Sequence, residues 1–559
     1  MLMGFGATVF FFSATEAPAQ TPTANRAPTR IELRGEPMEL SLVDVLDIAF
    51  AQNLDIEIRR LEADSAGDRA DGSVGIYDPV LGADVLRRQT ESDSPSASAA
   101  NVAGASSQEK STDARASLSQ LIPTGGVISV EATDSRVRVL DSRANNSVFS
   151  PYNRQRAAIA IRQPLLKNFG RDITDAGIRV ARRQERIALY NYQQEVLDRL
   201  ADVLSAYWEL TFATRNLEVQ LASLDAAVEL ERVNKARVDA GASPLADLLQ
   251  ARAQAAQRRN NVIQAKSNII NSQDTLLALL NWQRSGPIWN APIVPVDKPT
   301  QYDLDTTFDD EALIVEALDT RPFFQAALTV QEIAEITRNV ASWQRLPELN
   351  LIGEYGFNAV DETFSSTNSE LRRGDYTSYF YGLEFRYPLL NRTARADYRA
   401  SLSDLERAAR LIDQAELAVI VEVRAATRAI RTAQESIEAS VAQVAAAQET
   451  LDAERKRLEV GASTTFNVLD FQEDLALAQT NEVRAQVDFQ QGLIQLERSR
   501  GTLLDALARD LGIQINFEEV IYEDDSAISS PDDRLRREEL LVPIQSESRE
   551  QPAQDTTTQ

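Results

Sequence analysis

The chain has 559 residues, a formal net charge of -26, and neither cysteine nor histidine. Without thiolate and imidazole side chains, the usual zinc sites and the catalytic triads that need either group are excluded. The excess of acidic over basic residues disfavours nucleic acid as a partner, because phosphate backbones are bound by basic patches. No phosphate-binding glycine loop occurs either, so we expect neither a cofactor nor catalysis.

An apolar stretch over residues 1–12 opens the sequence, and residues 17–19 form the small-x-small pattern that signal peptidase recognises. We expect residues 1–19 to be a signal peptide and residues 20–38 to be a disordered N-terminus. No Lys or Arg precedes the apolar run, which leaves a misassigned start codon or an ordinary disordered terminus open. Later in the chain no run of eighteen apolar residues occurs, so a membrane crossing must be made by strands.

The sequence contains a duplicated unit of helix, strands and two long helices. Three pairs of landmarks recur in the same order: Asn53 with Pro79 and Arg321 with Pro347, the segments 161–166 and 385–390, and the Gly-Ala-Ser triplets at 241–243 and 461–463. We therefore expect a first repeat over residues 39–286, a linker over 287–310 and a second repeat over 311–512. The acidic residues 513–559 are expected to be a disordered tail.

Each repeat ends in two long helices. Residues 174–236 lack proline and are rich in Ala, Leu, Glu, Gln and Arg, which predicts one helix on the order of 95 Å long. A second helix is predicted over 245–280, and the pair recurs over 394–458 and 465–507. These pairs form hairpins, placed at 172–284 and 394–510. Such rods fit a coiled bundle better than a globular domain.

Extended segments precede both hairpins, at 80–163 and 348–387. In residues 348–358 and 378–387 apolar and polar residues alternate, with tyrosine enriched, which suits a strand with one face in lipid and one in water. The alternation is equally expected of half-buried strands in a soluble sheet. The first repeat offers four candidate strands, over 80–87, 114–121, 127–136 and 156–163, with a tight turn at 123–126.

The chain resembles the TolC family of outer-membrane efflux and secretion channels over roughly residues 40–511. The resemblance rests on the Gln163-Pro164-Leu165-Leu166 junction between strand and helix, on the pattern Leu46, Ala49 and Asn53, and on two similar hairpin turns at 237–243 and 457–463. It implies an all-α dominated α+β membrane protein with internal duplication. In this fold, a trimeric transmembrane β-barrel is continued by a long periplasmic α-helical barrel.

The resemblance also implies where the protein acts and with what. It predicts a passive conduit in the outer membrane of a Gram-negative bacterium, part of a tripartite efflux pump or a type I secretion system. The implied partners are two further copies of the chain, a periplasmic adaptor protein, an inner-membrane RND or ABC transporter, and outer-membrane lipid. Family members usually give four strands per chain, so either the barrel is larger here or the hairpin around Pro123 lies outside it.

Site residues follow from the resemblance at the hairpin turns. The turns are implied to contact the adaptor through Gly241, Ala242, Ser243, Gly461, Ala462 and Ser463. A periplasmic gate is implied at Asp247, Asn467 and Asp470, and of these only the two aspartates carry over as acidic residues that symmetry would repeat as a ring of charge in a pore. The chain departs from the family pattern at Leu458, Ser463 and Asn467. From the local sequence alone, the acidic residues are interpreted as solvated side chains that the dipole at a helix N-terminus stabilises.

A structural coiled-coil protein of the periplasm is the alternative. It accounts for the long helices and the charge. It does not account for tyrosine-rich alternating segments at the same point of the second repeat where the first repeat has its own extended segments. The cargo, and the choice between efflux and protein secretion, stay open at this point.

Overall fold

The computed structural model describes residues 37–93, 106–141, 150–282, 291–299 and 308–511. These residues form two compact units, and each unit draws on both repeats. Unit 1 contains the described residues of Met1–Glu57, Glu195–Glu316 and Ile420–Arg500, and unit 2 those of Ile58–Gln194, Ala317–Val419 and Gly501–Gln559. Across this described part of the chain, no helix combines the length and apolar character needed to cross a membrane.

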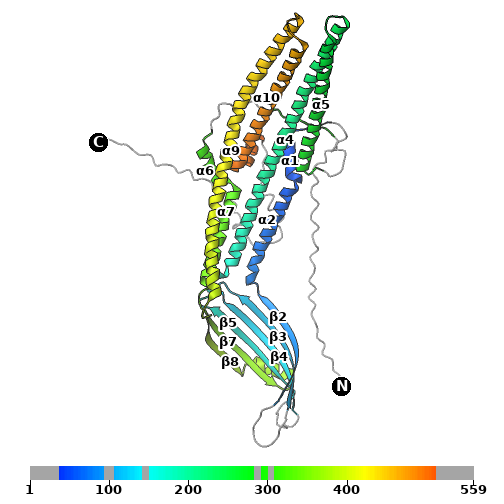
Figure 1. Cartoon of the computed structure of the whole chain (residues 1–559). Coiled ribbons are helices and arrows are strands. Elements are labelled where there is room, and N and C mark those ends of the chain that lie inside the picture. Colours follow the sequence, from blue (N-terminus) through cyan, green and yellow to red (C-terminus); the bar gives the residue numbers. More distant parts are fainter. Residues whose placement is uncertain (1–36, 94–105, 142–149, 283–290, 300–307, 512–559) are drawn as a thin grey trace, which may run out of the picture. The chain divides into compact units, whose positions relative to one another are not determined.

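Four long helices form two hairpins, as the sequence predicts (Figure 1). The first hairpin pairs α4 with α5, and the second pairs α9 with α10; their bounds are Ala176–Asp239, Leu245–Leu279, Arg392–Glu459 and Thr465–Arg500. Helix α10 is shorter than the predicted segment 465–507. It ends before Gly501, whose φ of 79° leaves the helical region, and α11 follows over Leu503–Leu511.

Unit 1 has its core between helices. In the second hairpin, Ile430 and Ile437 of α9 pack against Phe489 and Leu496 of α10. The helices approach so closely that a Cβ on Gly492 would lie 3.0 Å from Ile430 Cγ1, which explains a glycine inside a helix. In the first hairpin, the buried face of α4 is formed by Leu197, Leu200, Leu204, Tyr207 and Leu210.

In unit 1 a small parallel pair of strands joins the start of the first repeat to the segment between the repeats. Strand β1, Met38–Leu40, pairs with β6, Ile293–Pro295, which lies in the segment between the repeats. The Tyr207 hydroxyl donates to Asp297 Oδ2 at 2.7 Å and accepts from the Asp297 N–H at 3.2 Å. Burial raises the pKa of Tyr207 above its usual range. The short helices α1, Leu42–Gln52, and α6, Asp310–Thr320, complete the described elements of this unit.

Unit 2 is built on one antiparallel sheet of six strands in the order β2-β3-β4-β5-β7-β8 (Figure 1). The strands are Val80–Asp93, Ser106–Leu121, Val127–Asp141, Tyr152–Pro164, Glu348–Asp361 and Thr377–Arg386. Every predicted strand is present, and most run further than predicted. The turn at Pro123 joins β3 to β4 inside the sheet, where Gly125 has a φ of 83°. The sheet therefore has six strands per chain rather than four.

The sheet has two chemically different faces, which the register defines. One cross-strand row consists of Leu81, Leu118, Val130, Ile159, Tyr355 and Tyr379, all exposed; we call this side the apolar face. On the opposite side, a row three residues further along the strands consists of Asp84, Arg115, Thr133, Arg156 and Asn358; we call this side the polar face. The alternation of apolar and polar residues predicted for 348–358 thus corresponds to two different faces of the whole sheet.

Within unit 2 the two ends of the sheet differ. The remaining helices of the unit are α2 and α3, Leu54–Ser73 and Arg171–Thr174, then α7 and α8, Pro322–Trp343 and Phe364–Arg373, with the 3-10 turn η1 at Val74–Tyr77. Strands β2 and β7 follow η1 and α7, and strands β5 and β8 precede α3 and α9; we call this end of the sheet the helix end. The opposite end carries the connections β2–β3, β4–β5 and β7–β8, and we call it the loop end.

Candidate functional site at the hairpin tips

The two hairpin turns have the same backbone structure. Gly241 and Gly461 adopt φ values of 74° and 75°, a region that side chains with a Cβ rarely enter. In each turn the next N–H reaches back to the final helical turn: Ala242 donates to the Arg237 carbonyl and Ala462 to the Arg457 carbonyl, both at 2.8 Å. This double arrangement ends a helix sharply and starts the next one. Both glycines and both alanines are exposed, while Ser243 and Ser463 are half-buried.

In the first hairpin the predicted gate residue Asp247 lies in the first turn of α5 and is bonded to the hairpin turn that precedes it. The Ser243 hydroxyl donates to Asp247 Oδ2 at 2.6 Å, and the Asp247 N–H donates to the Pro244 carbonyl at 3.2 Å. The side chain is half-buried in the first turn of α5. The helix dipole stabilises a carboxylate in the first turn of a helix, which is the interpretation of Asp247 that the local sequence suggests.

In the second hairpin the equivalent residue, Asn467, belongs to a larger network. Its Nδ2 donates to Ser463 Oγ at 3.3 Å and lies 3.4 Å from Glu454 Oε1. Ser463 also donates to Glu454, and Arg457 Nη1 lies 3.4 Å from Glu454 Oε2. Glu454 is only 6% exposed. The hydrogen bond from Ser463, with those from Arg457 and Asn467, holds the pKa of Glu454 below its usual range despite burial.

Two buried polar contacts join the hairpins near the tips. Thr465 Oγ1 donates to Asn234 Oδ1 at 3.0 Å, and both residues are buried. Arg258 of α5 donates through Nη2 to the Leu469 carbonyl of α10 at 2.8 Å and through Nη1 to the Ser223 hydroxyl. Only 3% of Arg258 is exposed, and burial lowers its pKa. These contacts fix α10 against the first hairpin.

The third predicted gate residue, Asp470, is exposed on α10. Among the contacts of the described residues, nothing joins Asp247 to Asn467 or to Asp470. Within one chain the three residues thus do not form a common cluster. The glycines and alanines of the turns and Asp470 are exposed, which leaves them accessible to other chains.

Three polar residues at the tips were not found from the sequence: Asn234, Arg258 and Glu454. Asn234 and Glu454 each stand seven residues before the glycine of their turn, so the duplication itself marks them as equivalent. Arg258 has no such signal, because its counterpart in the second hairpin is Ala478. A lone arginine in a helix normally predicts a solvated side chain.

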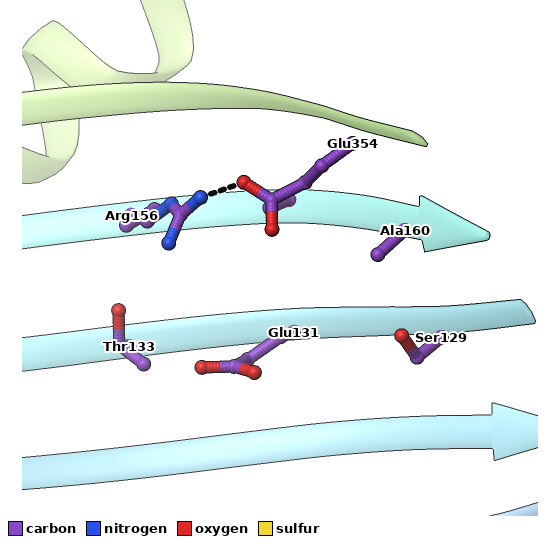
Figure 2. Close-up of a pocket in the computed structure, with 7 residues that line it drawn as sticks. Ser129, Glu131, Thr133, Arg156, Ala160 and Glu354 are labelled. Carbon is purple, nitrogen blue, oxygen red and sulfur yellow. Dashed lines mark hydrogen bonds and ion pairs between the residues drawn. The ribbon is translucent and has the colours of Figure 1, made fainter. Parts of the chain in front are cut away.

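The polar face of the sheet is a second candidate site. Arg156 of β5 pairs with Glu354 of β7, and Arg115 of β3 lies 3.2 Å from Glu131 of β4. Figure 2 shows this hollow, with Arg156 and Glu354 joined above Glu131, Ser129 and Thr133. Both signs of charge line the same face, which suits a water-filled passage.

Comparison with known proteins agrees with this geometry. The model of the family described as outer membrane efflux protein matches residues 97–281 and 313–502, one segment in each repeat. The chain is 26% identical over 340 residues to outer membrane protein TolC of Vibrio cholerae, which covers 59% of this chain and 74% of that protein. It is 26% identical over 339 residues to protein CyaE of Bordetella pertussis, covering 60% and 67%.

A solved structure supports the same fold. The outer-membrane channel OprN superimposes with a TM-score of 0.62 at 17% identity, over 82% of this chain and 90% of that one.

Proposed function

Because the chain belongs to the outer membrane efflux protein family, we propose that three copies of it close a single channel. The protein is an outer-membrane channel component for efflux or type I secretion in a Gram-negative bacterium, with a periplasmic extension. The family assignment gives no support to a structural coiled-coil protein without a channel.

The observation that carries the proposal is the apolar row across all six strands. Leu81 and Tyr379, at its two ends, are 78% and 72% exposed. A fully exposed apolar row is costly in water but stable in lipid, and the polar face then lines the lumen. The edges β2 and β8 expose unpaired backbone groups, which a bilayer does not tolerate. Pairing β2 of one copy with β8 of the next removes both edges.

Three copies of a six-stranded sheet give a barrel of 18 strands, three times six. Adjacent strands in the sheet are antiparallel throughout, so β8 and β2 of neighbouring copies also run antiparallel, and the ring closes without a parallel junction. Barrels of about 16–18 strands enclose an aqueous channel, whereas eight-stranded barrels are filled by side chains. The passage is therefore wide enough for solutes.

The hairpin tips are proposed to contact a periplasmic adaptor protein. Gly241, Ala242, Gly461 and Ala462 are exposed and small, so a partner can approach the backbone closely, and Ser243 and Ser463 lie beside them. An inner-membrane transporter of the RND or ABC class would supply the energy, and the channel itself would need no catalysis.

The periplasmic gate is proposed at Asp247, Asn467 and Asp470. Asp247 and Asn467 are held by hydrogen bonds within their own hairpins, so they would contribute to the gate by fixing the turns and not as free charges. Asp470 is exposed, and threefold symmetry would repeat it as a ring of carboxylates. A ring of like charge attracts cations and can bind one that blocks the pore.

Single-channel conductance in a planar bilayer tests the proposal, after the mass in detergent has been checked for a trimer. We expect discrete steps that divalent cations reduce, and Asp470→Ala should weaken this block. Glu459→Ala, which removes an exposed carboxylate at the end of α9, serves as the control. If Asp470→Ala and the control behave alike, the gate assignment is wrong and the channel stands. A monomer that never conducts would contradict the channel.

A further inference from the structure

The apolar face changes character toward the loop end of the sheet. The third and fourth rows beyond that of Leu81 on this face carry four cations, which we call the basic rim: Arg87, Lys110, Arg136 and Arg138. Lys110 stands directly opposite Arg138, and Arg87 and Arg136 both stand opposite Thr112. The side chains of Arg87, Arg136 and Arg138 are exposed, and that of Lys110 is half-buried. Four cations thus occupy three adjacent strands.

The basic rim is short of counter-charge. Like charges directly opposite each other destabilise an antiparallel pair, so the Lys110–Arg138 pair calls for an anion. On the same face the nearest carboxylates are Asp134 and Glu91, and Asp134 accepts from Gln155 Nε2 at 2.9 Å. Within the described part of the chain, none of the four cations has an ion pair. The cations are available to an external anion.

A groove adjoins the basic rim on the same face. It has a volume of about 440 Å³ and lies between helix α8 and strands β2 to β5. Its lining includes the small apolar side chains of Ala83, Ala114, Ala116 and Ala132 and that of Leu371 of α8, while Asp134, Gln155 and Asn368 add polar groups. Val85 of the same lining is two residues from Arg87 of the rim. An apolar slot therefore opens within about 7 Å of the cations, the rise of two residues in a strand.

Helix α8 is fixed against the apolar face rather than attached loosely. The Glu362 carbonyl before the helix accepts from Asn153 Nδ2 at 3.0 Å, and Glu370 Oε2 accepts from the Val360 N–H at 3.2 Å. Gly374 after the helix lies so close to the Phe357 ring that a Cβ there would be 3.2 Å from it. Thr367 in the middle of the helix is fully buried. The groove wall is thus part of the fold.

We propose that the basic rim and this groove bind a phosphate-bearing lipid of the outer leaflet, with the phosphate on the rim and an acyl chain in the groove. The inference rests on the proposed placement of the sheet in the outer membrane, with its apolar face in lipid. That placement puts the loop end at the outer surface, since the helix end leads to the periplasm. Cations at this end of the apolar face lie at headgroup depth, where each strengthens binding to an anionic surface about fivefold.

A lipid fits the site better than an acidic protein does. The row between the rim and the apolar rows holds Val85 and Ala114 beside Asp134 and Gln155. The apolar residues of the adjoining groove are alanine, valine, leucine and the half-exposed Phe364. An acidic protein would satisfy the cations but not the slot. A molecule with an anionic head and hydrocarbon chains satisfies both.

The test measures lipid bound to the detergent-solubilised full chain by native mass spectrometry. The probe is diphosphoryl lipid A, compared with the same lipid after removal of its phosphates. In the rim variant, Lys110→Gln is combined with Arg138→Gln, and we expect about 30-fold weaker binding, from two lost cations. The control combines Arg88→Gln with Arg154→Gln, which removes two exposed cations from the polar face of the same sheet.

A third variant, Ala116→Phe, fills the groove and should also weaken retention of the lipid while leaving the rim intact. Equal binding by the rim variant and the control, or binding that survives removal of the phosphates, would overturn the inference. Conductance of each variant separates the two proposals. If the chain conducts but its lipid binding does not depend on the rim, only the lipid site is refuted. If the unmodified chain does not conduct, the channel is refuted.

Discussion

At the scale of single residues, the buried position seven residues before the turn glycine differs between the two hairpins. Asn234 and Glu454 occupy the same place relative to their turns, yet Asn234 bonds to the other hairpin through Thr465, and Glu454 bonds within its own. The second turn is therefore held by a carboxylate that can be protonated. The first turn has no such group at this position.

We predict that acid loosens the second turn. Because hydrogen bonds lower the pKa of Glu454 in the folded chain, its contribution to stability is fully present above the unfolded pKa, near 4.3. The contribution is lost as pH falls through the lower folded pKa. Hydrogen exchange over residues 459–465, corrected for the intrinsic pH dependence, should rise below about pH 4. In Glu454→Gln the exchange should be faster at neutral pH and should lack this acid-dependent step.

We predict opposite effects for one chemical change at two glycines. Gly461→Ala places a Cβ at a φ of 75°, which costs about 1–2 kcal/mol, so exchange at the turn should accelerate roughly 5- to 30-fold. Gly67→Ala lies inside α2, where the new Cβ would meet Glu185 at an ordinary 3.6 Å. It should stabilise that helix by about 0.5–1 kcal/mol. Equal slowing of exchange at both sites would contradict the role of the positive φ.

At the scale of elements, the contact between α5 and α10 depends on a buried cation. Arg258→Ala removes the donors to the Leu469 carbonyl and to Ser223, so we expect α10 to separate more easily from the first hairpin. The readout is a higher open fraction in single-channel recordings. Arg259→Ala is the matched control, because Arg259 is the next residue and is exposed. If both variants open the channel equally, loss of positive charge and not of the contact is responsible.

Periodicity and turn chemistry were enough to predict the hairpins and all six strands. The Gly-Ala-Ser triplets at 241–243 and 461–463 predicted both turns, because glycine is the residue that ends a helix in this way. Strand ends were missed where polar residues such as Arg87 and Arg88 continue β2 on both faces, since alternation disappears there. The end of α10 at Gly501 was missed because one glycine inside a helical pattern is usually tolerated.

The candidate site was less predictable than the fold. The turn residues could be named, since they are local in sequence. Partners such as Arg258 with Leu469, or Thr465 with Asn234, come from different helices, and a single sequence carries no signal of which helix faces which. The position of α8 on the apolar face depends on contacts with β5 and β7 that no periodicity encodes.

At the scale of the whole molecule, the absence of cysteine makes the assembly testable by cross-linking. A cysteine at Val85 of β2 is combined in turn with one at Tyr379, Tyr381 or Leu383 of β8, all on the apolar face. Directly opposed residues in antiparallel strands are close enough for a disulfide. We expect one pair to give covalent dimers and trimers on oxidation.

The control places cysteines at Leu118 and Val130, which stand opposite each other within one chain. These two cysteines should form a disulfide within one chain, so no covalent dimer or trimer should appear. If none of the β2–β8 pairs forms higher species while the control closes, the two edges do not meet in the assembly.

The hairpin formed by β3 and β4 has a consequence for how such channels vary in calibre. A hairpin adds two strands, so its insertion leaves the direction of both sheet edges unchanged, and a chain with or without it can still close on its neighbours. Barrel diameter rises roughly linearly with strand number. The bore can thus be widened or narrowed in fixed steps of one hairpin per chain, while the turns at Gly241 and Gly461 keep their own structure. Outlet size and partner recognition can evolve separately.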